Sequence, residues 1–113
     1  MEHSLIMPQV TTVNHPLAQH HLTRLRDVQT PPAEFRALVR RLAMLLACEA
    51  TRELQLESAE VVTPLIATRG ARLRQRIGLV PILRAGLGMV DPVLELLPEA
   101  EVWHLGLYRD EET

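Results

Sequence analysis

The stretch that decides the fold is residues 77–107, with the sequence IGLVPILRAGLGMVDPVLELLPEAEVWHLGL. It opens with a nearly continuous apolar run at 77–83, which is typical of a parallel strand buried on both faces. Apolar residues then recur at helical spacing over 89–97, and Pro98 marks the expected helix end. A second strand is expected at 101–107. Strand, helix and strand within about 30 residues predict a right-handed βαβ unit and an α/β fold with a parallel sheet.

One residue limits the helix of this unit. Pro92 lies inside the helical pattern, and proline has no N–H to donate to the preceding turn. We therefore expect Pro92 in or near the first turn, where the missing donor does no harm.

Two helices are expected upstream. Asn14 is the expected N-cap of a short helix that ends near Asp27. Thr30 is the expected cap of a long helix over about 31–52, with proline in its first turn. The long helix carries apolar residues at offsets of 0, 3, 4, 7, 10 and 11, which define one face: Phe35, Leu38, Val39, Leu42, Leu45 and Leu46. We expect this face to be buried against the sheet or a partner subunit.

Between the long helix and the βαβ unit, residues 61–63 predict a short edge strand that ends at Pro64. Residues 65–76 are expected to form a loop or hairpin arm and then a turn. Residues 1–12 show no periodicity and are expected to be a flexible arm, which leaves 13–113 as the domain. Two strands are few for a parallel sheet, so we expect the chain to be cut within an α/β domain.

The composition excludes several classes of function. The chain has 113 residues, 47% of them hydrophobic, with a net charge of -2 and one cysteine. No apolar run is long enough for a membrane span, and one cysteine allows neither an internal disulfide nor a multi-cysteine zinc site. All 12 basic residues are arginine, so neither a Schiff-base lysine nor a P-loop lysine is present. A cytoplasmic protein that does not bind nucleic acid in bulk is expected.

An arginine follows each expected strand of the βαβ unit, Arg84 the first and Arg109 the second. Ligands of open α/β sheets bind at the carboxyl ends of the strands. Gly86 and Gly88 lead into the helix, where backbone N–H groups can approach an anion. Since guanidinium groups bind phosphate oxygens in a bidentate manner, the pattern indicates a phosphate or pyrophosphate site with both arginines facing one cleft. The alternative is that the arginines lie on the surface and the glycines only shape a turn.

Several blocks of the sequence resemble the uracil phosphoribosyltransferases, which have the type I phosphoribosyltransferase fold. They are PILRAGLGMVD at 81–91, GLYRDEET at 106–113, VNHPLAQHHLTRLRD at 13–27 and FRALVRRLAMLLACEATREL at 35–54. The resemblance implies transfer of the phosphoribosyl group of phosphoribosyl pyrophosphate (PRPP) to uracil, which yields UMP and pyrophosphate in pyrimidine salvage. It also implies Mg²⁺ bound with PRPP, a homodimer or larger assembly, and, in some members, activation by GTP.

The same resemblance assigns roles to residues. Arg84, Ala85 and Gly86 fall on the family loop that contacts the pyrophosphate of PRPP, and Arg109 falls on a second PRPP-contacting arginine. No catalytic residue and no metal ligand is assigned. The family's acidic-pair PRPP segment, its uracil pocket and its hood have no counterpart in the sequence, which resembles only about the first half of a member. Pro92 stands where the family usually has glycine.

Other polar residues have structural explanations that we prefer. His15, His20 and His21 lack the spacing of a zinc pair on one helix face, and His15 before Pro16 is expected to cap or pack. Glu49 is either a buried acid with a shifted pKa or, as we favour, a partner of the backbone or of an arginine near the helix end.

Four further residues also have structural explanations that we prefer. Cys48 is expected to be a small buried hydrophobic residue. Arg72, Arg74 and Arg76 could contact RNA, but no aromatic residues are interleaved with them, so a solvated strand edge is favoured.

Three functions therefore compete. The first is a uracil phosphoribosyltransferase of which this chain is the N-terminal part, inactive alone. The second is a non-catalytic truncated paralogue or an anion-binding or assembly module. The third is a regulatory relative that binds PRPP or UMP and acts on RNA, which would need a basic face that this sequence does not show.

Overall fold

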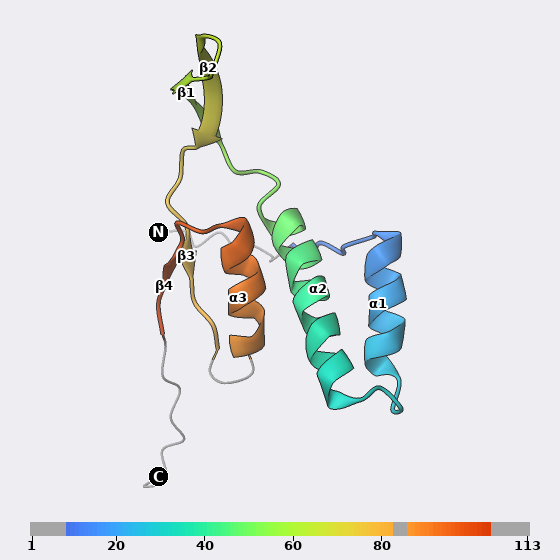
Figure 1. Cartoon of the computed structure of the whole chain (residues 1–113). Coiled ribbons are helices and arrows are strands. Elements are labelled where there is room, and N and C mark those ends of the chain that lie inside the picture. Colours follow the sequence, from blue (N-terminus) through green and yellow to red (C-terminus); the bar gives the residue numbers. More distant parts are fainter. Residues whose placement is uncertain (1–8, 83–85, 105–113) are drawn as a thin grey trace, which may run out of the picture.

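The computed structural model describes residues 9–82 and 86–104 (Figure 1). Helix α2 lies between α1 and α3, the two parallel strands lie on the far side of α3, and a β-hairpin projects from one end (Figure 1). In chain order the elements are α1 (Pro16–Arg26), α2 (Pro32–Ala50), β1 (Leu56–Val62), β2 (Ala67–Leu73), β3 (Gly78–Leu79), α3 (Leu87–Leu96) and β4 (Glu101–Val102).

The βαβ unit is confirmed. Strands β3 and β4 pair in parallel, with Gly78 opposite Glu101 and Leu79 opposite Val102, and α3 connects them. The Glu101 amide donates to the Ile77 carbonyl at 3.0 Å, which continues the ladder at its start. The regular strands are shorter than the apolar runs suggested, and Leu83 and residues 105–107 of those runs lie outside the described residues.

Pro92 lies deeper in its helix than expected. It is the sixth residue of α3, beyond the first turn, and it is fully buried. Gly88, one turn earlier on the same helix face, points at α2, since a Cβ built there would lie 3.9 Å from the Cγ1 of Val39. Pro92 therefore faces α2, where burial of its ring offsets the hydrogen bond that it cannot donate to the Gly88 carbonyl.

Both expected N-caps were wrong. His15, not Asn14, caps α1, because its Nδ1 accepts a hydrogen bond from the Leu17 amide at 3.0 Å. The N-cap of α2 is Pro31, whose side chain has no atom that can accept such a bond. The hydroxyl of Thr30 instead donates to the Arg24 carbonyl. Thr30 thus ties the end of α1 to the turn before α2.

The expected face of α2 was only partly right. Leu38 is 2% exposed, but Phe35 is 45% exposed, and Leu42 and Leu45 are only half-buried. The other buried residues of α2 are Ala43 and Ala47. Helix α2 packs on two helices, α1 and α3, instead of one sheet, so small residues are buried where the helices approach closely.

The hairpin arm is confirmed and is longer than expected. Strands β1 and β2 pair antiparallel from Leu56 opposite Leu73 to Val62 opposite Ala67. Within the strands only Ala59 is half-buried, and every other residue is exposed. The hairpin stands away from the helices (Figure 1). In the part of the chain that the structure describes, no helix has both the length and the apolar character to cross a membrane.

Candidate functional site

The candidate site begins where the chain leaves β3 and turns into α3. The Gly86 amide donates a hydrogen bond to the Ile82 carbonyl at 2.7 Å and closes this turn. A Cβ built on Gly86 would lie 3.0 Å from the Ile82 nitrogen and 3.2 Å from its oxygen. Both are backbone atoms, so a larger residue at this position would require the Ile82 backbone to move by a few tenths of an ångström.

The turn leads directly into a helix N-terminus. Gly86 is the N-cap of α3, and its carbonyl accepts a hydrogen bond from the Met89 amide at 3.1 Å. The first turn of α3 contains no acidic residue. The positive end of the helix dipole therefore lies at the carboxyl end of β3, an arrangement that favours an anion.

Of the residues that the sequence assigned to PRPP, the structure places Gly86. Arg84, Ala85 and Arg109 lie outside the described residues. The parallel pairing of β3 with β4 is the relationship that the arginine hypothesis requires, because the carboxyl ends of both strands then point the same way. That the two arginines face one cleft stays a prediction.

An apolar groove borders the turn. We call it the β3–α3 groove, and it has a volume of about 460 Å³. Its lining consists of Leu79, Val80, Pro81, Ile82, Gly86, Met89, Val90 and Val93. All of these residues are apolar, so the groove suits an apolar segment and not a phosphate.

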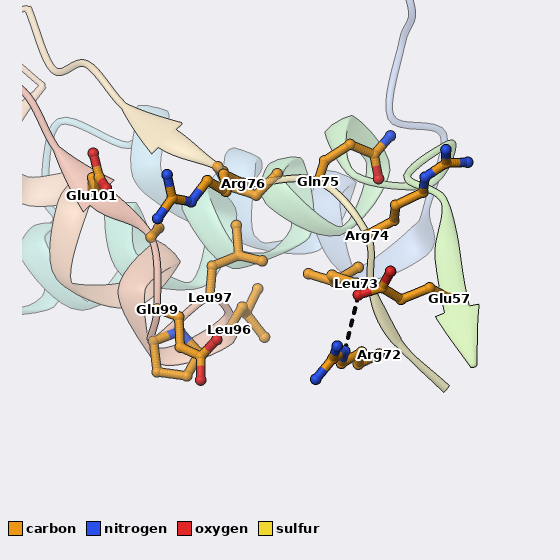
Figure 2. Close-up of a pocket in the computed structure, with 13 residues that line it drawn as sticks. Glu57, Arg72, Leu73, Arg74, Gln75, Arg76, Leu96, Leu97, Glu99 and Glu101 are labelled. Carbon is orange, nitrogen blue, oxygen red and sulfur yellow. Dashed lines mark hydrogen bonds and ion pairs between the residues drawn. The ribbon is translucent and has the colours of Figure 1, made fainter. Parts of the chain in front are cut away.

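A second cavity of about 490 Å³ lies between the base of the hairpin and the α3–β4 connection (Figure 2). Arg72 Nε donates to Glu57 Oε1 at 2.9 Å on its hairpin side. Its charged residues are three arginines and three glutamates: Arg72, Arg74, Arg76, Glu57, Glu99 and Glu101. This balance gives the cavity no net charge to attract an anion. From the sequence, a solvated strand edge was favoured for these arginines over contact with RNA, and all three are exposed, but the cavity was not predicted. The one sequence signal for this cavity was that its three arginines stand at every second position, 72, 74 and 76.

The interpretation of Glu49 as an arginine partner is confirmed. Arg52 Nε and Nη2 both donate to Glu49 Oε2, at 3.0 and 2.9 Å. This hydrogen bond, and then the charge of the carboxylate, raise the pKa of Arg52. The pair links the last turn of α2 to the residues that follow it.

The other residues considered for chemistry have these positions. His15 caps α1 as expected, and the rings of His20 and His21 meet edge to face with their centroids 5.3 Å apart. The described residues include no group of three or more histidine, cysteine or acidic side chains that could hold a metal ion.

Cys48 is exposed, so its expected burial was wrong. It lies one position beyond the buried Ala47, which rotates its side chain off the packed face of α2.

Comparison with known proteins identifies the family. The family model for uracil phosphoribosyltransferase matches residues 12–113. The chain is 58% identical over 107 residues to the uracil phosphoribosyltransferase of Roseiflexus sp. strain RS-1, covering 95% of this chain and 51% of that protein. It is 56% identical over 108 residues to the uracil phosphoribosyltransferase of Alkaliphilus oremlandii, covering 95% of this chain and 52% of that protein.

A solved structure agrees. The AQ2163 protein of Aquifex aeolicus matches with a TM-score of 0.77 and 36% identity, over 87% of this chain and 48% of that one. The chain thus spans about half the length of the curated relatives it matches. The structure has a tight glycine turn between a parallel strand and a helix, and the sequence matches the family model over residues 12–113. The chain belongs to the uracil phosphoribosyltransferase family.

Proposed function

We propose that this chain carries the pyrophosphate-binding part of a uracil phosphoribosyltransferase. The reaction joins uracil to the ribose carbon of PRPP and releases pyrophosphate, which yields UMP. The observation that carries the proposal is the turn from Ile82 to Gly86, closed by a 2.7 Å hydrogen bond at the start of α3, in a chain of this family. A tight turn at a helix N-terminus is suited to a diphosphate.

In this proposal the leaving group is held by two arginines and one turn. Negative charge on the pyrophosphate grows as the bond to ribose breaks, and fixed donors aimed at that charge lower the barrier. Arg84, Ala85 and Gly86 would contact the pyrophosphate from the first strand end. Arg109 would contact PRPP from the second. Pairing of β3 with β4 supports this assignment, because it brings the two strand ends side by side.

Mg²⁺ belongs to the proposal as a companion of PRPP. Magnesium in phosphoryl substrates is bound largely by phosphate oxygens and water, and it neutralises part of their charge. No described residue of this chain is assigned as its ligand. Activation by GTP, which the resemblance implies for some members, is carried to this chain only as part of this proposal.

A homo-oligomer is also proposed, and the hairpin supports it. A two-stranded hairpin is marginally stable by itself in water. This one exposes Val62 by 81%, Leu65 by 96% and Ile66 by 69%. A second copy of the chain that covered these side chains would stabilise the hairpin. Light scattering should then give a mass above that of one chain, and Leu65→Asp should lower it.

The second candidate is a non-catalytic anion-binding or assembly module, and the exposed apolar side chains at the hairpin tip favour it. In this candidate the chain binds an anion or pairs with a longer subunit without turning over substrate.

A chimera separates the two candidates. The part of the Roseiflexus relative that matches this chain is replaced by this chain, and the product is assayed for UMP with uracil, PRPP and Mg²⁺. Turnover comparable to that of the unmodified relative is expected under the enzyme hypothesis. A folded chimera that makes no UMP would favour the assembly module.

A further inference from the structure

Pro92 is an interior residue of α3 that the local rules of helix formation disfavour. It is the sixth residue of the helix, and its side chain is fully buried. Proline is the residue least suited to a helix interior, because it lacks the N–H that would donate to the carbonyl four residues earlier. That carbonyl belongs to Gly88, in the first turn of α3 and two residues beyond the N-cap Gly86.

Packing against α2 does not by itself call for a proline at this position. A valine would bury an apolar side chain of similar size and would also donate to the Gly88 carbonyl. Proline differs from valine here in withholding that one hydrogen bond. Departures from local sequence rules are expected at functional sites, and this departure affects the end of α3 that borders the candidate site.

The two ends of α3 are held differently. Beyond Pro92, the ion pair between Arg40 Nη2 and Glu95 Oε1, 3.6 Å apart, links the helix to α2. In the first turn, the Met89 amide donates to the Gly86 carbonyl at 3.1 Å, while the Gly88 carbonyl receives no hydrogen bond from residue 92. The missing bond therefore lies between the part of α3 that is fixed to α2 and the turn that ends at Gly86.

We propose that Pro92 is a positioning residue for the pyrophosphate of PRPP. By withholding a hydrogen bond from the Gly88 carbonyl, it lets the first turn of α3 adjust to the anion while the rest of the helix stays on α2. The first N–H groups of a helix have no partner within it, so a small shift of this turn changes how they meet phosphate oxygens. Pro92 itself touches no substrate in this role. The inference rests on the proposed function for the identity of the anion.

The test restores the missing donor in the chimera. Pro92→Val keeps a buried apolar side chain and adds the N–H, and Pro92→Ala adds the same N–H with a smaller side chain. In both variants the Kd for pyrophosphate, measured by calorimetry with Mg²⁺ present, should rise about fivefold or more. KM for PRPP should rise with it while KM for uracil stays unchanged, a split that a general loss of stability would not produce.

Glu95→Gln is the matched control on the same helix. It removes the ion pair with Arg40 but leaves every backbone donor of α3 in place. The Kd for pyrophosphate should stay within about twofold of the parent's, since exposed ion pairs contribute little. Thermal unfolding of each variant checks that it folds.

Hydrogen exchange supplies a measurement that needs no substrate. In the 113-residue chain, amides 89–91 should exchange more slowly in Pro92→Val than in the parent, because the first turn then belongs to a continuous ladder of hydrogen bonds. Glu95→Gln should leave their exchange unchanged.

Two outcomes would overturn the proposal. One is a Pro92→Val variant that binds pyrophosphate as tightly as the parent. The other is a loss of affinity in Pro92→Ala alone, which would assign Pro92 a packing role. A chimera that binds pyrophosphate but makes no UMP would refute the enzyme function, and the affinities of the variants would still decide the role of Pro92. A chimera that makes UMP with one KM for PRPP in parent and variants would do the reverse, and a chimera that neither binds pyrophosphate nor makes UMP would refute both.

Discussion

The Gly86 amide nitrogen lies 2.7 Å from the Ile82 carbonyl oxygen and donates a hydrogen bond to it. This bond joins Ile82, three residues beyond β3, to the N-cap of α3, which spans Leu87–Leu96. It lies where the family resemblance places the pyrophosphate loop. The predictions that concern PRPP depend on this turn.

Gly86→Ala in the chimera should lower kcat/KM for PRPP. The new Cβ would lie 3.0 Å from the Ile82 nitrogen, so the backbone must shift, at a cost of about 1–3 kcal/mol or roughly 5- to 150-fold. Steady-state kinetics with varied PRPP measures the loss. Gly88→Ala is the matched control, since its Cβ would meet only the Cγ1 of Val39 at an ordinary 3.9 Å. Equal effects at the two positions would contradict the role of the turn.

Arg84→Ala in the chimera should weaken productive use of PRPP. A charge-assisted hydrogen bond contributes about 1.5–3 kcal/mol, so kcat/KM for PRPP should fall ten- to a hundred-fold or more. Arg36→Ala, an exposed arginine on α2, should change it little. An unchanged kcat/KM for PRPP in the Arg84 variant would remove Arg84 from the site.

The 113-residue chain alone should make no UMP. We propose that it contributes the pyrophosphate contacts, but base discrimination needs donors and acceptors placed against uracil, and the blocks that resemble the family do not include its uracil pocket. Purified chain is incubated with uracil, PRPP and Mg²⁺ and assayed for UMP. Turnover within the ordinary enzyme range of about 1–10³ per second would show that the portion of the relatives that this chain does not match is dispensable.

Leu38→Ala should be the most destabilising truncation on α2, the helix Pro32–Ala50. Leu38 is 2% exposed, and removing a buried leucine side chain costs about 2–5 kcal/mol of unfolding free energy. Phe35→Ala is the control, because Phe35 is 45% exposed and should cost less. Urea unfolding followed by circular dichroism compares the two. The opposite order would show that α2 packs through a different face.

The free energy of unfolding should decrease in acid, because protonation of Glu34 removes its ion pair with Arg24. Arg24 Nε and Nη2 donate to the two carboxylate oxygens of Glu34 at 2.7 and 2.9 Å. This hydrogen bonding, together with the charge of Arg24, holds the pKa of Glu34 below its usual value of 4.5. Because the pKa is lower in the folded state, the contribution is present above pH 4.5 and is lost as the pH falls through the folded pKa.

Glu34→Gln should therefore flatten the pH dependence of unfolding below the usual carboxyl pKa. The two side chains are 44% and 39% exposed, so added salt should also weaken the effect in the parent protein. Thermal unfolding over a pH series, with and without salt, measures both. A Glu34→Gln profile that overlays the parent's would exclude this pair as the cause.

Local patterns predicted much of the chain correctly. The apolar runs around β3 and β4, the helical spacing between them and the stop at Pro98 sufficed for the βαβ unit. The β-branched run before Pro64 predicted a short edge strand, and the structure has β1 there, paired with a β2 that the sequence predicted only as a loop or hairpin arm. The sequence placed Gly86 at the junction of a strand and a helix, and the structure has it there, as the N-cap of α3. Each of these features depends on residues close together in the sequence.

The sequence by itself therefore determined the helices, the βαβ unit and the position of the glycine at the start of α3. Only the tertiary structure decided which surfaces are buried. Because α2 packs between α1 and α3, Ala43 and Ala47 are buried while Phe35 stays half in solvent. Because α3 packs on α2, Pro92 is tolerated beyond the first turn, and because β3 lacks a full cover among the described residues, Val80 and Ile82 are exposed. Periodicity shows which residues share a face, but the partner that covers the face is set by contacts between segments far apart in the chain.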